Sequence, residues 1–400
     1  MSFHRSRPID FEGHNEEVRR VWRAYHAGRP HRVPVEICGS IRNYFNNPEL
    51  NRSGFDFEDF FTDPRAQVEC QLAWQKYARW NIVCDREMGP PQGGWPLAVD
   101  LQNSYEAGWF GCPLRCFGLD VPDTEEILKE RKERLFDLEP PDPLRGGLLG
   151  RAMEFFDYMH QAGPRMEFEG LPVKPPATIP GEGTDGPFTV ACKLRGAAEV
   201  CLDLYEDPEY FHALMDFVTA QTIRRMKAIR EWRWSLRPES PDRGQFRRPG
   251  WYFADDSIAL LSVGQYREFV LPYHRRLVAE FSDGTGVSMH LCGDATRHFP
   301  TLKAELGVRT FDTGFPVDFA WLRRELGPEV RINGGPSIML VKDGPSAAIA
   351  GEVRRICGSG IMDGGRFVLI AANNLAPCTP IEHVEALSEA GKRFGTYPEA

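Results

Sequence analysis

Short apolar segments alternate with helix-length segments along most of this 400-residue chain, and this alternation constrains the fold more than any other feature. Strands separated by helices favour parallel pairing, and closing such a sheet on itself removes its two edges. The pattern therefore predicts an α/β protein with the architecture of a (β/α)8 TIM barrel. The eight predicted strands cover residues 33–38, 81–85, 188–194, 251–257, 286–292, 308–312, 330–333 and 366–371.

Two regions depart from this alternation. Residues 1–30 form a predicted N-terminal helical extension, and residues 86–186 form a predicted insertion or cap that is rich in Pro, Gly and aromatic residues. Loops of this length usually have a function, so aromatic rings such as Trp109 could cover a ligand at the barrel mouth. The same rings could instead build a satellite core. We expect both regions to belong to one domain over residues 1–400.

Charge and hydropathy exclude two classes of partner. The formal net charge is −9 and the basic residues are dispersed among acidic ones, so no basic surface is available for nucleic acid. No apolar run is long enough to cross a membrane, and the N-terminus lacks the apolar core of a secretory signal. Ten cysteines without dense regular spacing fit a reducing compartment. We therefore expect a cytoplasmic protein that acts on a small molecule.

Polar residues follow the predicted strands at the end where barrel enzymes carry their chemistry. His290 and Cys292 share a strand face because side chains alternate, and imidazole with thiolate suits zinc. The alternative is a packed pair that binds no metal. For Asp256 and Asn374, solvation or helix capping is the favoured interpretation. The full set of strand-end residues is Asp85, Asp255, Asp256, His290, Cys292, Asp312, Asn333, Asn373 and Asn374.

Four motifs, taken in order, resemble the uroporphyrinogen decarboxylase superfamily, which includes the corrinoid-dependent methyltransferases. The motifs are FADDS (253–257) with YREFVLPY (266–273), HLCG (290–293), INGGP (332–336) and LAPCTPIEHV (375–384). The resemblance implies the same barrel that the periodicity predicts. The His-X-Cys-Gly motif places the chain nearer the zinc methyltransferase branch than the true decarboxylases.

This resemblance implies an enzyme that moves a methyl group between a small substrate, a methoxylated aromatic or a thiol, and a cobalamin carried by a separate corrinoid protein, with zinc assisting. In thiol-activating relatives a further Cys precedes the Pro-X-Thr-Pro segment, and the matching position here is Asn373. The third metal ligand is then Asp312 or Cys378, since carboxylate and thiolate both bind zinc. If the metal site has decayed, His290 serves as an acid or base.

The expected site has three parts. The metal ligands are drawn from His290, Cys292, Asp312 and Cys378. The expected catalytic residues are Asp255, His290, Asp312 and Asn333. The expected substrate-binding residues are Arg42, Tyr44, Asp85, Trp109 and Asn373.

Two other functions stay open at this point. One is a decarboxylase of a uroporphyrinogen-like polycarboxylate, in which Arg42 and Arg195 hold carboxylates and Asp85 stabilises a pyrrole-like cation. The other is a non-catalytic barrel that binds a corrinoid or porphyrin. Metal content and carbon dioxide release distinguish these functions from methyl transfer.

Overall fold

A parallel sheet of six strands forms the centre of the computed structural model, which describes residues 4–5 and 7–398. Its order is β1-β11-β10-β9-β8-β7, and every neighbouring pair is parallel. The first strand thus pairs with the last, as in a barrel. The strands are β1 (Val35–Glu36), β7 (Trp251–Ala254), β8 (Val287–Leu291), β9 (Val308–Thr313), β10 (Arg331–Gly334) and β11 (Phe367–Ile370).

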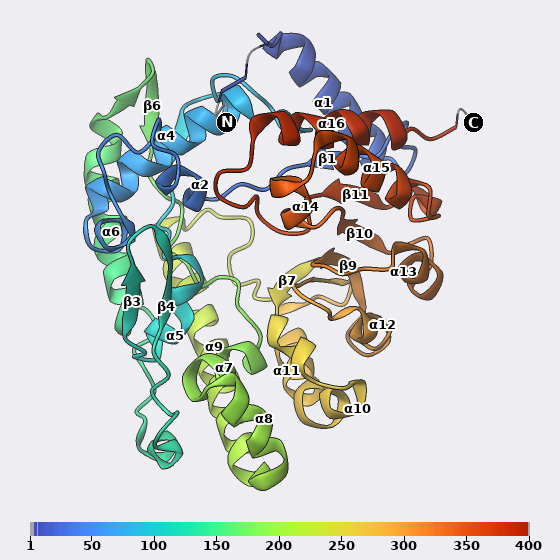
Figure 1. Cartoon of the computed structure of the whole chain (residues 1–400). Helices are drawn as coiled ribbons and strands as arrows, with labels where there is room; N and C mark the ends of the chain where they lie inside the picture. Colours follow the sequence, from blue (N-terminus) through green and yellow to red (C-terminus); the bar gives the residue numbers. More distant parts are fainter. Residues whose placement is uncertain (1–3, 6, 399–400) are drawn as a thin grey trace.

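Helices follow these strands along the chain, which confirms the predicted α/β class. Figure 1 shows β7, β9, β10 and β11 following one another through the molecule, with α10 to α13 along one side. The helices are α1 (Phe11–His26), α2 (Ile41–Phe45), α3 (Phe57–Thr62), α4 (Pro64–Asn81), α5 (Tyr105–Trp109), α6 (Gly147–Ala162), α7 (Pro187–Arg195), α8 (Ala197–Glu206), α9 (Pro208–Leu236), α10 (Val263–Gln265), α11 (Leu271–Phe281), α12 (Phe299–Leu306), α13 (Phe319–Leu326), α14 (Ile338–Asp343), α15 (Ser346–Cys357) and α16 (Ile381–Phe394). Within the described residues, no helix is both long and apolar enough to span a membrane.

Irregular segments occupy both edges of the sheet, where the other two barrel strands were expected. At one edge, the Asp85 backbone N–H donates to the Val35 carbonyl at 2.7 Å. At the other, Asp185 forms a parallel bridge with Ala254, and the Ala254 N–H donates to the Thr184 carbonyl at 3.2 Å. Over residues 4–5 and 7–398, no ladder joins the two edges.

Two of the predicted strands are therefore wrong. Residues 188–194 lie inside α7, which begins at Pro187 and is buried on nearly every side. A short apolar run buried on all sides has the same pattern as a helix or a strand, so periodicity could not separate the two. Residues 82–85 follow the end of α4 at Asn81 without forming a regular strand.

Residues 86–186 add a three-stranded sheet, a hairpin and the helices α5 and α6 to one flank of the central sheet. Strands β2 (Trp95–Pro96), β6 (Leu171–Lys174) and β5 (Glu167–Phe168) pair with one another, and β3 (Leu114–Phe117) and β4 (Asp120–Thr124) form a hairpin. The aromatic rings of this region are mostly buried in the main hydrophobic core, including those of Trp95, Trp109, Phe110, Phe155 and Phe156. Packing thus accounts for most of the aromatic content.

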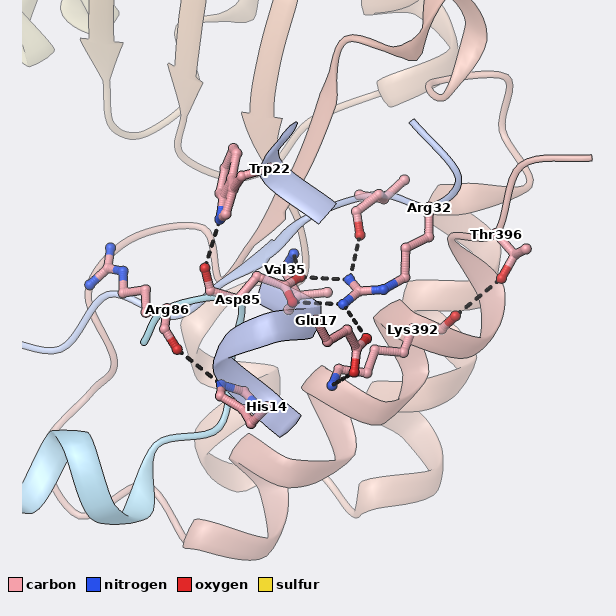
Figure 2. Close-up of polar contacts among 10 residues, drawn as sticks. His14, Glu17, Trp22, Arg32, Val35, Asp85, Arg86, Lys392 and Thr396 are labelled. Carbon is pink, nitrogen blue, oxygen red and sulfur yellow. Dashed lines mark hydrogen bonds and ion pairs between the residues drawn. The ribbon is translucent and has the colours of Figure 1, made fainter. Parts of the chain in front are cut away.

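Helix α1 and the segment after α16 lie close to the segment that leads into β1. Helix α1 lies beside α16 in Figure 1, and the Val33 N–H donates to the Gly395 carbonyl at 2.8 Å. Figure 2 shows the polar cluster at this junction: the Arg32 guanidinium grips the Asp85 carboxylate at 2.6 and 2.7 Å and also contacts Glu17 at 2.7 Å. Asp85 further accepts the Val35 N–H at 2.6 Å. Both oxygens of the Asp85 carboxylate are therefore engaged in structural contacts.

Candidate metal centre and the surrounding cleft

His290 and Cys292 meet at the carboxyl end of β8. His290 lies on the strand and Cys292 directly after it, so strand alternation turns both side chains to the same face. The His290 Nε2 lies 2.8 Å from the Cys292 Sγ. On the other side of the ring, the His290 Nδ1 lies 2.7 Å from an oxygen of Asp312 on the neighbouring strand β9. The imidazole is thus held at both nitrogens.

Asp256 completes a group of three possible metal ligands. One ligand atom each from Asp256, His290 and Cys292 lies within 4.8 Å of the others. The Asp256 carboxylate also accepts the Cys292 backbone N–H at 2.7 Å, which fixes the start of the loop after β8. Nitrogen, sulfur and carboxylate oxygen are the donors that zinc prefers in proteins, so these residues fit the expected metal.

The structure gives the two other expected metal ligands, Asp312 and Cys378, different contacts. Asp312 binds the ring nitrogen that faces away from Cys292, which is the usual role of a carboxylate behind a metal-binding histidine. The Cys378 Sγ contacts the Asn46 carbonyl at 3.4 Å and lines a different pocket. Asp256 was expected only to be solvated or to cap a helix. The register between β7 and β8 places it beside the other two residues of the cluster, since Ala254 pairs with His290 and Asp256 is therefore level with Cys292.

The electrostatic surroundings favour a charged histidine when no metal is bound. Burial lowers the pKa of His290, but the hydrogen bonds and charges of Asp312 and Cys292 outweigh it and raise this pKa to about 11. Burial, with the nearby charges of Glu106 and Asp256, raises the pKa of Asp185 well above its usual range. The cleft thus holds an imidazolium together with Asp185, whose carboxyl group has a raised pKa.

The cluster opens into a polar cleft with a volume of about 650 Å³. One wall comes from the 86–186 region, through residues such as Asp100 and Tyr105, and another from Tyr252 on β7. The remaining polar lining includes Arg42, Glu106, Asp185, Asp256, Asp312, Asn373 and Asn374. Such a concave site with convergent polar groups is where a small substrate would bind.

Two of the expected substrate-binding residues lie in this cleft. Arg42, on α2, lines it with a guanidinium whose buried Nε has no hydrogen-bond partner in the described part of the chain. Asn373 lies after β11 and donates its side-chain N–H to the Cys292 Sγ at 3.0 Å. Both residues were expected from the loops that follow predicted strands.

Three other expected substrate-binding residues lie elsewhere. Asp85 is bound to Arg32 and Val35 at the amino end of β1, whereas the cluster lies at the carboxyl end of β8. Tyr44 is buried with its hydroxyl against Cys70. Trp109 is buried in the core, and its indole N–H donates to the Asp142 carbonyl at 2.8 Å. Apolar packing and ion pairing account for all three.

Two expected catalytic residues also have structural contacts instead. Asp255 is fully buried and accepts hydrogen bonds from Thr189 at the start of α7, as well as lying 2.7 Å from His274 Nε2. It therefore joins α7 to β7 rather than facing the cleft. The Asn333 side chain accepts a hydrogen bond from Arg331 Nε at 2.8 Å, and Asn333 is not among the cleft residues.

A buried ion pair behind the cleft was missed from the sequence. Arg225, on the long helix α9, is fully buried and donates to Glu106 at 2.8 Å. Glu106 also accepts the Thr184 hydroxyl at 2.5 Å and the Asp185 backbone N–H at 2.9 Å. This network holds the edge segment that places Asp185 in the cleft. No local motif signals it, because its residues come from three distant parts of the chain.

The C-terminal part of the chain matches a known family model. The family model described as uroporphyrinogen decarboxylase (URO-D) matches residues 251–394. This stretch contains β7 to β11 and the candidate metal ligands Asp256, His290 and Cys292. The match confirms the superfamily resemblance that the motifs predicted, over the C-terminal part of the chain.

The relatives place the chain nearer the methyltransferases. It is 26% identical to a methylated-thiol–coenzyme M methyltransferase of Methanosarcina mazei over 335 residues, which cover 82% of this chain and 78% of that protein. It is 24% identical to a uroporphyrinogen decarboxylase of Coxiella burnetii over 53% of this chain and 57% of that protein. A solved methyltransferase from Methanosarcina mazei has the same fold, with a TM-score of 0.60, 18% identity, and coverage of 94% of this chain and 98% of that one. Together these similarities support a methyltransferase-like enzyme.

Proposed function

We propose that this protein transfers a methyl group between a small methylated substrate and a cobalamin carried by a separate corrinoid protein, with zinc assisting. The observation that carries the proposal is the cluster of Asp256, His290 and Cys292, backed by Asp312, at the carboxyl end of a parallel sheet. Similarity to a methylated-thiol–coenzyme M methyltransferase supports the reaction class. A methoxylated aromatic or a methylated thiol is the proposed substrate.

The residues around the proposed metal have different roles. A zinc ion held by Asp256, His290 and Cys292 would supply a Lewis acid for the sulfur or oxygen that loses or gains the methyl group. Asp312 keeps the proton of His290 on Nδ1, which leaves Nε2 free to bind metal. Asp256 fixes the backbone at Cys292. The remaining polar lining of the cleft orients the substrate.

The region 86–186 is part of this proposal. Asp100, Tyr105 and Glu106 from this region line the same cleft as the cluster. We propose that it belongs to one domain with the barrel and covers the substrate there. The ten cysteines are all unpaired, which fits a reducing compartment, and the proposed location is the cytoplasm.

Specific contacts argue against the decarboxylase reading. Of the two arginines expected to hold carboxylates, Arg195 is bound to Asp203 at 2.9 Å in a buried pair, and only Arg42 lines the cleft. Asp85 lies at the opposite end of the sheet and is engaged by Arg32. Several carboxyl groups line the cleft and would repel a polycarboxylate.

The decisive experiment combines metal analysis with methyl transfer. The purified protein is analysed for zinc and then incubated with cob(I)alamin and either 2-methoxyphenol or dimethyl sulfide as methyl donor. Formation of methylcobalamin by the zinc-containing protein, but not by Cys292→Ala, supports the proposal. Metal-free protein that releases carbon dioxide from uroporphyrinogen would establish the decarboxylase instead. A shift in visible absorbance on adding a corrinoid, without turnover, would favour a carrier.

A further inference from the structure

The Cys292 sulfur accepts a second side-chain hydrogen bond, from Asn373. The distance from Asn373 Nδ2 to Cys292 Sγ is 3.0 Å. The orientation of this amide is fixed by its neighbour, because the Asn374 backbone N–H donates to the Asn373 Oδ1 at 2.7 Å. The oxygen end of the amide is thereby occupied, and the NH2 group faces the sulfur.

The backbone of Asn373 is unusual for a residue with a side chain. Its φ is 143°, a conformation that favours glycine. Non-glycine residues in such conformations persist where surrounding contacts hold them, and they are frequent at functional sites. Two contacts hold this one: its own backbone N–H donates to the Ala371 carbonyl at 2.7 Å, and its side chain spans from Asn374 to Cys292.

Metal binding would affect the two hydrogen bonds to the Cys292 sulfur, from His290 and from Asn373, in different ways. A metal that binds Nε2 of His290 displaces the proton that this nitrogen shares with Cys292. The amide of Asn373 does not lose its proton when metal binds, so its N–H continues to donate to the sulfur. In the described part of the chain, Asn373 is thus the side-chain donor that remains on Cys292 in both states.

We propose that Asn373 is a positioning residue that lowers the reactivity of the Cys292 sulfur as a nucleophile and is not itself needed for metal binding. A thiolate beside a methyl donor can attack that donor itself: a sulfur–carbon bond forms, the bond from carbon to the leaving group breaks, and the leaving group departs with the electron pair. An N–H···S hydrogen bond draws electron density from the sulfur and slows this attack. The inference rests on the metal cluster of the proposed function, but it does not require methyl transfer.

The test uses iodoacetamide on the metal-free protein, with alkylation of each cysteine followed by peptide mass spectrometry. Rates are compared on the plateau at high pH, so that the sulfur is thiolate in every variant. We expect Cys292 to be alkylated several-fold faster in Asn373→Ala than in the parent. Cys38, the other cysteine that lines the cleft, is the internal control and should keep its rate. Asn374→Ala is the matched variant, because it retains the backbone N–H that orients Asn373.

A second measurement separates this role from simple packing. In the Co²⁺-loaded protein, loss of the hydrogen bond should move the sulfur-to-cobalt charge-transfer band to longer wavelength in Asn373→Ala but not in Asn374→Ala. Unchanged alkylation rates and an unchanged band in Asn373→Ala would overturn the inference. Complete loss of Co²⁺ from a folded Asn373→Ala would also overturn it, since Asn373 would then be needed to bind the metal. If the parent transfers no methyl group yet Cys292 reacts as described, the proposed function fails and the inference stands.

Discussion

Replacing Asp85 by Asn should destabilise the fold without touching the cleft. The Asp85 carboxylate is fully buried, and its two oxygens accept from Arg32 and from the Val35 backbone, as Figure 2 shows. Asp85→Asn keeps the shape but removes the charge that neutralises Arg32, whose side chain is only 7% exposed. Removing one partner of a buried pair typically costs about 3–5 kcal/mol, because the other charge stays buried and uncompensated.

The remaining partner of Arg32 sets where in this range the loss should fall. Glu17 still contacts Arg32 at 2.7 Å, but its side chain is 35% exposed and its charge is partly screened by water. We therefore expect the free energy of unfolding to fall by about 3 kcal/mol, the lower end of that range. Urea unfolding followed by tryptophan fluorescence measures this change.

A surface pair provides the matched control. Arg19 and Glu87 pair at 2.9 Å near the same junction, with side chains 48% and 37% exposed. Arg19→Ala should cost less than about 1 kcal/mol, as exposed ion pairs do. An Asp85→Asn variant with the parent's stability and no methyl transfer would refute this reasoning. It would indicate that Asp85 binds the substrate.

Three further predictions concern the cluster and the core. Cys292→Ala and Asp256→Ala should lose stoichiometric zinc, whereas Cys378→Ala should retain it; loss in the Cys378 variant would contradict the ligand set. In metal-free protein, the raised pKa of His290 should stabilise the fold fully at pH values below 6.5, the ordinary pKa of histidine, and this contribution should be lost as the pH rises towards 11. The difference in the free energy of unfolding between the parent and His290→Gln should therefore close across that interval. A constant difference would refute this prediction. Trp109→Ala should lower stability by about 3–5 kcal/mol with an unchanged KM, and a raised KM in a stable variant would place its ring on the substrate.

The fold was predictable where local pattern and long-range pairing agree. The strands after residue 250 each combine an apolar run with a polar end, and the structure has all of them. The run at 188–194 was wrongly predicted to be a strand because it is apolar on every side. In the structure it forms α7, and Asp255 accepts hydrogen bonds at the start of this helix. Tertiary contact decided the structure of that segment, and periodicity could not.

The site was predictable in its centre and less so around it. His290 and Cys292 follow from strand alternation, but the role of Asp256 depends on the register between β7 and β8, which the sequence does not encode locally. Asp85 illustrates the opposite error. A charge at a predicted strand end suggested a substrate group, and its partner Arg32 lies 53 residues earlier in the chain.

The pairing of β1 with β11 bears on how the protein is made. Val35 lies beside Leu369, so the first strand leaves the ribosome long before its partner exists. Until then the edge of β1 is unpaired, and sheets completed by such distant contacts form slowly and expose edges prone to aggregation. A chain that stops before β11 would leave β1 and β10 both open. Strand β11 is therefore the element whose loss would leave two strands of the sheet without a partner on one side.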